Sequence, residues 1–153
     1  MAPLRFIDIF CGIGGFRLAF ERAGARCVFS GDWDKFSRQT YAANFGETPH
    51  GDIHSVAVAD ILDHHQPPAF VLENVKHLVR HDQGRTFKII HDTLADALGY
   101  QVYWRIITAQ SVLPQHRQRI FLVGFKPGRA FEFPEFPAEG PKLTSILNAE
   151  QPV

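Results

Sequence analysis

The feature that most constrains the fold is a short apolar run that ends in a cluster of glycines. Residues 6–10 read Phe-Ile-Asp-Ile-Phe, and glycine stands at positions 12, 14 and 15. Apolar residues then recur at helical spacing, at Phe16, Ala19, Phe20 and Ala23. A strand that passes through a glycine turn into a helix is the opening unit of nucleotide-binding doubly wound sheets, because glycine lets backbone and ligand approach closely.

The alternation of strands and helices continues after this unit. Gly24 is placed to end the first helix, and residues 26–30 then predict a second strand that runs parallel to the first. A second helix over residues 36–43 is expected to stop at Gly46, and a third strand to begin near residues 51–53. The class predicted is therefore α/β.

The second half of the chain resumes the pattern. A strand is predicted from Ala69 to Leu72, followed by a helix that Gly99 ends and whose apolar face holds Phe87, Ile90, Leu94, Ala97 and Leu98. Strands over 100–106 and 120–125 are expected to form a closing pair at one sheet edge. We expect residues 1–126 to form the main domain and the proline-rich residues 127–153 to be a strap or linker.

Composition narrows the possible partners and the compartment. With 45% hydrophobic residues and a length of 153, the chain should fold around one core. Sixteen basic residues balance sixteen acidic ones, so any contact with DNA must come from local clusters. Cys11 and Cys27 have no metal-binding spacing, and no apolar run reaches ~18 residues. We therefore expect a reduced, cytoplasmic protein with no metal site and no membrane partner.

The glycine cluster has two interpretations when taken alone. Arg17 stands where a Gly-x-Gly-x-x-Gly fingerprint has its third glycine, which counts against a dinucleotide site and leaves a plain tight turn possible. Asp32, 20 residues after Gly12, favours a ligand site because a carboxylate there can accept hydrogen bonds from ribose hydroxyls. Trp33 offers a flat face for adenine. The alternative is a helix-capping Asp and a core Trp.

Four segments, in order, resemble the DNA cytosine-C5 methyltransferase family. They are Asp8-Ile9-Phe10-Cys11-Gly12-Ile13-Gly14-Gly15-Phe16-Arg17, then Asp32-Trp33-Asp34-Lys35, then Phe70-Val71-Leu72-Glu73-Asn74-Val75-Lys76, and lastly Gln115-His116-Arg117-Gln118-Arg119. The resemblance covers nearly the whole chain. It implies a Rossmann-like, doubly wound and mainly parallel sheet of the S-adenosylmethionine-dependent methyltransferase type.

The resemblance also implies roles for individual residues. Glu73 would protonate N3 of a flipped-out cytosine in DNA, and Arg117 and Arg119 would stand near the base and the catalytic loop. Without the other motifs, Glu73 could equally be a helix cap and the arginine pair a solvated face. The residues that would line the S-adenosylmethionine pocket are Phe10, Gly12, Gly14, Asp32, Trp33, Asp52 and Ile53.

One block of the family pattern is missing. The family's nucleophile is a cysteine thiolate in a Pro-Cys loop, and this sequence has no Pro-Cys dipeptide. That loop belongs between the third-strand Asp and the Glu-Asn-Val motif, where only residues 54–68 remain. Neither Cys11 nor Cys27 is expected to replace it. The chain also ends at Val153, where the family continues into its target-recognition region, so we expect sequence-specific recognition to be lost.

The missing block includes one central strand of the sheet. We expect a continuous chain in which the strand beginning at Ala69 moves inward and pairs with residues 6–10. A sheet that opens along unpaired edges is the alternative. Residues omitted from the sequence would instead separate two consecutive Cα atoms between Val56 and Pro68 by more than ~3.8 Å.

Three functions compete at this point. The first is a truncated methyltransferase that is inactive alone, unless a second polypeptide supplies the missing segments. The second is a non-catalytic module that binds S-adenosylmethionine or a partner. The third, a dinucleotide-dependent oxidoreductase, is disfavoured by Arg17 and by the later motifs.

Overall fold

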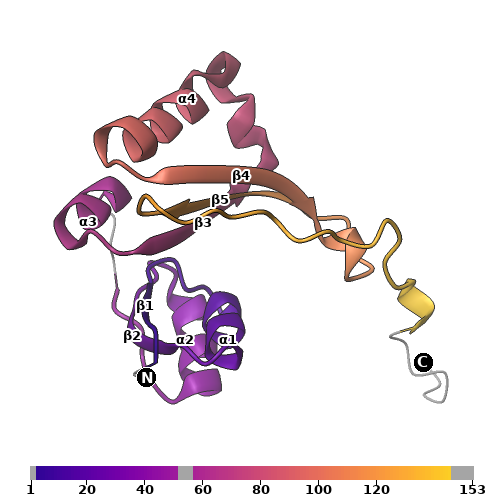
Figure 1. The fold of residues 1–153 in the computed structure, drawn as a ribbon. Helices are drawn as coiled ribbons and strands as arrows, with labels where there is room; N and C mark the ends of the chain where they lie inside the picture. The colour runs from indigo at the N-terminus through magenta and orange to yellow at the C-terminus, as the bar shows by residue number, and fades with distance from the viewer. Residues whose placement is uncertain (1–2, 52–56, 146–153) are drawn as a thin grey trace, which may run out of the picture. The chain divides into compact units, whose positions relative to one another are not determined.

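The structure of the protein, a computed structural model, describes residues 3–51 and 57–145. The chain divides into two units, Met1–Val58 and Ala59–Val153 (Figure 1). None of the described helices is both long and apolar enough to cross a membrane. A domain boundary near residue 126 stays a prediction.

The first unit is built on one parallel pair of strands. β1 (Arg5–Asp8) pairs with β2 (Arg26–Ser30), and the two alternate with helices α1 (Gly15–Arg22) and α2 (Lys35–Phe45). The predicted strand-helix-strand unit and its parallel pairing are confirmed. β1 ends two residues earlier than expected, so Phe10 belongs to the turn.

Glycines end both helices of this unit, as predicted. Gly46 has φ 69° and donates its N–H to the carbonyl of Ala42, which closes α2. Gly24 has φ 85° and donates to Glu21 after α1. The N-terminus of α2 is capped by Asp34, whose side chain accepts from the amide of Ser37.

A third segment begins to pair with β2 at His50, near the end of the first described range. His50 forms a parallel bridge with Gly31, with hydrogen bonds from the amide of Asp32 to His50 (3.0 Å) and from the amide of His50 to Ser30 (2.9 Å). Asp52 and Ile53 lie outside the described residues. The third strand therefore stays a prediction. The distances between consecutive Cα atoms from Val56 to Pro68 also stay a prediction, because this stretch begins outside the described residues.

The second unit is an antiparallel three-stranded sheet with helices. Strand β5 lies between β3 and β4, and β4 and β5 are the predicted closing pair. The strands and α-helices are α3 (Val58–His65), β3 (Ala69–Val75), α4 (Arg85–Asp92), β4 (Gln101–Thr108) and β5 (Gln118–Phe125). Shorter turns are η1 (Lys76–Val79), η2 (His81–Gly84), η3 (Thr93–Ala97), η4 (Ala109–Ser111) and η5 (Leu143–Ser145).

The expected pairing of β3 with β1 is wrong. β3 pairs with β5 over its whole length, from Ala69 opposite Phe125 to Val75 opposite Arg119. β1 pairs with β2, and the described strands form two separate sheets. The antiparallel ladder with β5 satisfies the backbone groups on one edge of β3. In the described sheet β3 is an edge strand, so the hydrogen bonds with β1 that the prediction required are not formed.

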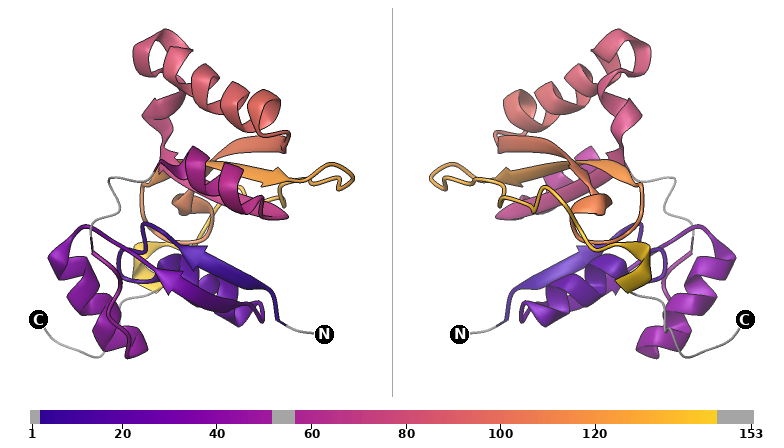
Figure 2. Two further views of the ribbon diagram at one scale, coloured as in Figure 1. Left: turned by 90° about the vertical axis from the view of Figure 1, so that its left-hand side faces the viewer. Right: turned by 90° about the vertical axis from the view of Figure 1, so that its right-hand side faces the viewer.

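α4 covers one face of the sheet of the second unit, as both views in Figure 2 show. The core of this unit lies on that face. Ile120 and Leu122 of β5 are at most 2% exposed, and the ring of Phe87 on α4 contacts that of Trp104 on β4 with centroids 5.1 Å apart. The predicted helix continues beyond α4 as the π turn η3, which buries Leu94. Gly99 then ends it with φ 69°.

The other face of this sheet carries the proline-rich tail. The ring of Phe131 contacts the rings of Tyr103 and Phe125, with centroids 5.6 and 5.4 Å apart. Arg105 of β4 donates a 3.3 Å hydrogen bond to the carbonyl of Pro134. The described tail has no helix or strand between Phe125 and η5. Its role as a strap or linker stays a prediction.

Candidate functional site

Asp32 connects the two loops that follow β1 and β2. Its Oδ2 accepts a 2.8 Å hydrogen bond from the amide of Gly12, and its Oδ1 accepts one of 2.8 Å from the amide of Asp34. The side chain is buried, with 6% of the residue exposed. The capping role considered for Asp32 is taken by Asp34 instead. The structure thus brings together the glycine turn and the carboxylate that the sequence singled out.

Backbone contacts hold the same two loops side by side. The amide of Cys11 donates to Gly31 (3.0 Å), and the amide of Gly31 donates to Asp8 (2.9 Å). Gly14 has φ 98°, and a Cβ there would lie 2.0 Å from the ring of Phe45. A side chain at Gly14 would therefore have both an unfavourable positive φ and a steric clash with Phe45, which accounts for glycine at this point of the turn.

Two aromatic side chains stand exposed beside this junction. Phe10 is 59% exposed and Trp33 is 63% exposed. The alternative of a core tryptophan is therefore wrong. Large exposed aromatic faces next to a buried carboxylate are suited to a flat ring such as adenine. Whether these residues bind a cofactor stays a prediction, and Asp52 and Ile53 lie outside the described residues.

Asp8 is a member of this site that the sequence analysis did not single out. It ends β1 with 6% exposure, and its Oδ2 is buried without a hydrogen-bond partner in the described part of the chain. Burial raises the pKa of the Asp8 carboxyl from 3.8 to about 6. An acidic residue inside an apolar strand, directly before a glycine turn, was the signal available in the sequence.

Neither cysteine has the properties of a nucleophile. Cys11 is 4% exposed, and burial, together with the nearby carboxylates of Asp8 and Asp32, raises the pKa of its thiol to about 12. Burial also raises the pKa of the Cys27 thiol, which is half-buried and donates to the carbonyl of Phe29. Both are neutral thiols near pH 7, and the thiolate is the reactive form. No group of described residues could hold a metal ion.

The second unit gathers the three predicted catalytic side chains. Arg119 Nε lies 3.0 Å from Oε1 of Glu73, and Arg117 Nη2 lies 3.7 Å from the same oxygen. Glu73 is opposite Phe121 in the ladder, so Arg119 is its diagonal neighbour on the same face of the sheet. The structure does not make Glu73 a helix cap, because Val75 precedes η1 and gives it no side-chain hydrogen bond.

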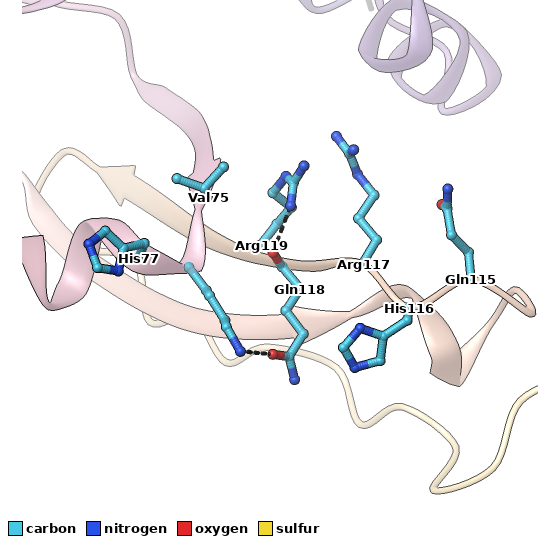
Figure 3. Close-up of a pocket in the computed structure, with 8 residues that line it drawn as sticks. Val75, His77, Gln115, His116, Arg117, Gln118 and Arg119 are labelled. Atoms are coloured by element: carbon cyan, nitrogen blue, oxygen red, sulfur yellow. Dashed lines mark hydrogen bonds between the residues drawn. The ribbon is translucent and has the colours of Figure 1, made fainter.

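Strand geometry separates the Gln-x-Arg-x-Arg motif into two sides. In Figure 3 Gln115, Arg117 and Arg119 point to one side of the chain, while His116 and Gln118 point to the other. Lys76 of η1 donates a hydrogen bond to Oε1 of Gln118 on that second side. These segments border a cavity of about 340 Å³ lined by Val75, Lys76, His77, Gln115, His116, Arg117, Gln118 and Arg119.

Comparison with known proteins places the chain in a family. A family model described as C-5 cytosine-specific DNA methylase matches residues 4–61 and 56–151. The Type II methyltransferase M.NgoBI of Neisseria gonorrhoeae is 43% identical over 168 residues, covering 84% of this chain and 53% of the relative. M.HaeII of Haemophilus aegyptius is 38% identical over 192 residues, covering 100% and 60% respectively. The chain thus spans little more than half the length of these relatives.

Solved structures agree on the fold. S. pombe Dnmt2 methyltransferase has a TM-score of 0.71 at 16% identity, covering 86% of this chain and 52% of that chain. The Entamoeba histolytica methyltransferase EhMeth has a TM-score of 0.76 at 15% identity, covering 99% and 62%. The predicted α/β class of the methyltransferase type is confirmed.

The comparisons also indicate the size and the place of the missing block. The aligned region is 192 residues long although this chain has 153, so the relative carries about 39 residues without a counterpart here. The two segments matched by the family model meet at residues 56–61, within the stretch where the sequence lacks the Pro-Cys loop. Because the family model matches nearly the whole chain in two segments, this protein belongs to the C-5 cytosine-specific DNA methylases.

Proposed function

We propose that this chain carries the S-adenosylmethionine-binding and cytosine-binding parts of a DNA cytosine-C5 methyltransferase, but not its nucleophile. The observation that carries the proposal is the convergence of Arg119 and Arg117 on one carboxylate oxygen of Glu73. These residues come from two motifs that are more than 40 positions apart in the sequence. Arginines that were only part of a solvated surface would not need to converge on one carboxylate. Family membership supports the same function.

The residues of the first unit fit an S-adenosylmethionine molecule. Asp8 offers a buried oxygen without a hydrogen-bond partner among the described residues, which suits the ammonium group of the methionine part. Each oxygen of Asp32 receives one backbone amide and keeps a second lone pair for a ribose hydroxyl. The exposed faces of Phe10 and Trp33 suit the adenine ring. Gly12, Gly14, Asp52 and Ile53 complete the proposed pocket. When bound, S-adenosylmethionine supplies the methyl group.

Glu73 is placed to act on the base. Arg119 bonds to its Oε1, so Oε2 is left to hold a proton and donate it to N3 of a flipped-out cytosine. Arg117 is half exposed at 50% and lies at the longer distance of 3.7 Å, which leaves its guanidinium able to bind the carbonyl oxygen of the base. Arg119 thus orients Glu73 and Arg117 faces the substrate.

The chain alone lacks the group that must attack carbon 6. With the pKa of Cys11 raised to about 12, roughly one thiol in 10⁵ is a thiolate at pH 7. We therefore expect no methyl transfer to DNA by this chain alone. A second polypeptide that contains the missing Pro-Cys block would be required, and DNA would be the shared substrate.

A non-catalytic module that binds S-adenosylmethionine or a partner is the competing function, and the absent Pro-Cys loop favours it. Two measurements decide among the outcomes. Titration calorimetry should show binding of S-adenosylmethionine and not of NAD. Labelled methyl groups should not appear in cytosine-containing DNA until a polypeptide carrying the missing block is added. Cofactor binding without any restored transfer would identify the module, and absence of cofactor binding would overturn the proposal.

A further inference from the structure

We propose that the end of the β3–β5 ladder holds a phosphate-binding cluster, separate from the base-binding side chains, that grips the backbone of a DNA strand. The cluster consists of Lys76, His77, His116 and Gln118. It rests on the proposed function, since DNA is the expected substrate, and it adds a site that base recognition does not need. Backbone contacts of this kind position DNA without reading its sequence.

Strand alternation separates the cluster from Glu73. Arg119 turns toward Glu73, whereas His116 and Gln118 point to the opposite side of the same segment (Figure 3). Lys76 reaches that second side from η1 and donates to Oε1 of Gln118. The bond ties the end of β3 to the start of β5 and leaves the amide nitrogen of Gln118 as a hydrogen-bond donor.

The charges at this position favour an anion. Lys76, His77, His116 and Arg117 are all exposed, and no Asp or Glu lines the 340 Å³ cavity that they border. The acidic residue nearest in the motif, Glu73, already pairs with Arg119. The Lys76 ammonium group keeps two donors after its bond to Gln118. Together with the neighbouring imidazole and amide N–H groups, these donors are suited to bind phosphate oxygens.

Because the cluster lies at the end of the ladder, one DNA strand can contact both the cluster and the base-binding side chains. Val75 pairs with Arg119 at this end of the ladder, so Lys76 follows the last pair directly. In the proposed complex, a nucleotide has its base toward Glu73 and Arg117 on one side of this end of the ladder, and its own or the next phosphate lies near Lys76 and His116 on the other side. The cluster would hold the strand while the base is turned out, which compensates part of the cost of unstacking.

The test compares two double variants that change the charge of the protein in the same way. Lys76→Gln with His116→Gln removes the cluster, while Lys88→Gln with His91→Gln removes the same residue types from α4, where both side chains contact Asp92. Binding to a fluorescein-labelled duplex is measured by anisotropy at several salt concentrations. We expect the first variant to bind at least fivefold more weakly at low salt and to lose about 0.9 from the slope of log K against log salt per phosphate contact. The α4 variant should stay within twofold of the wild type.

Nuclear magnetic resonance with inorganic phosphate separates this inference from the proposed function. Amide signals of Lys76, His77, His116 and Gln118 should shift on titration, and the shifts should vanish in the cluster variant. This result would stand even if S-adenosylmethionine failed to bind. Equal salt slopes for the two double variants, or phosphate shifts that avoid these four residues, would overturn the cluster while leaving the methyltransferase proposal intact.

Discussion

The amide of Gly12 donates a 2.8 Å hydrogen bond to Oδ2 of Asp32, which joins the turn after β1 to the turn after β2. The other oxygen of Asp32 accepts from the amide of Asp34. A single buried carboxylate therefore fixes both loops on which the proposed cofactor pocket is built. Because the bonds are charge-assisted and largely shielded from water, their loss should be costly.

Replacing Asp32 tests this connection. Asp32→Ala should lower the free energy of unfolding by about 3 kcal/mol, since two backbone amides lose a charged acceptor. It should also weaken S-adenosylmethionine binding by about 1 to 3 kcal/mol. Urea unfolding and titration calorimetry measure the two effects. Asp34→Ala is the matched control, because it removes only the side-chain cap of α2 and should leave cofactor affinity unchanged.

Asp8 predicts an unusual pH dependence of stability. Burial raises its pKa to about 6 in the folded protein, so the unfolded chain releases this proton first as the pH rises. The stability that the neutral carboxyl provides is therefore lost as the pH rises from about 4 to about 6, and this loss amounts to about 3 kcal/mol above that window. The difference in unfolding free energy between wild type and Asp8→Asn, measured from pH 4 to pH 7, should grow by that amount in favour of the variant. A constant difference would show that the pKa of this carboxyl is the same in the folded and the unfolded protein.

The two arginines beside Glu73 should not be equivalent. Arg119→Ala leaves a half-buried carboxylate without its 3.0 Å partner and should cost about 1 to 2 kcal/mol in unfolding free energy. Arg117→Ala should cost less than about 0.5 kcal/mol, because its side chain is half exposed and 3.7 Å away. Chemical denaturation of both variants checks the assignment. Equal losses would mean that the two arginines share the orienting role.

Gly124 of β5 is predicted to be required for packing. A Cβ at this position would lie 2.2 Å from two ring atoms of Phe70, which faces it from β3. Gly124→Ala should therefore destabilise the fold by about 1 to 3 kcal/mol. Combining it with Phe70→Leu should recover part of that loss, which a double-mutant cycle of thermal unfolding can measure. Simple additivity of the two changes would argue against the contact.

Local features of the fold could be predicted from the sequence, and distant ones could not. β2 occupies the predicted residues 26–30, and Gly24 and Gly46 end their helices, because turn chemistry and periodicity act over a few residues. The pairing of β3 with β5 joins strands more than 40 residues apart. Residue patterns predict that each segment is a strand but not which strands are neighbours, because pairing depends on contacts between distant segments.

The candidate site also combines features that the sequence predicted with features that it could not predict. The motifs predicted that Glu73, Arg117 and Arg119 belong together, and the structure brings them to one oxygen. The unpartnered oxygen of Asp8 depends on how completely α1 and the glycine turn bury the strand end, which no residue pattern states. The bond between Lys76 and Gln118 likewise depends on where η1 begins relative to β5.

Residue-level titration with S-adenosylmethionine tests the central claim most directly. In two-dimensional ¹H–¹⁵N spectra of the chain, the amides of Gly12, Gly14 and Asp32 and the indole N–H of Trp33 should shift in a saturable manner. Asp32→Ala should reduce these shifts at a ligand concentration below saturation, because binding is about 1 to 3 kcal/mol weaker, while the signals of the β3–β5 ladder should remain in place. Saturable binding whose shifts avoid the glycine turn and Trp33, or no binding at millimolar ligand, would contradict the account.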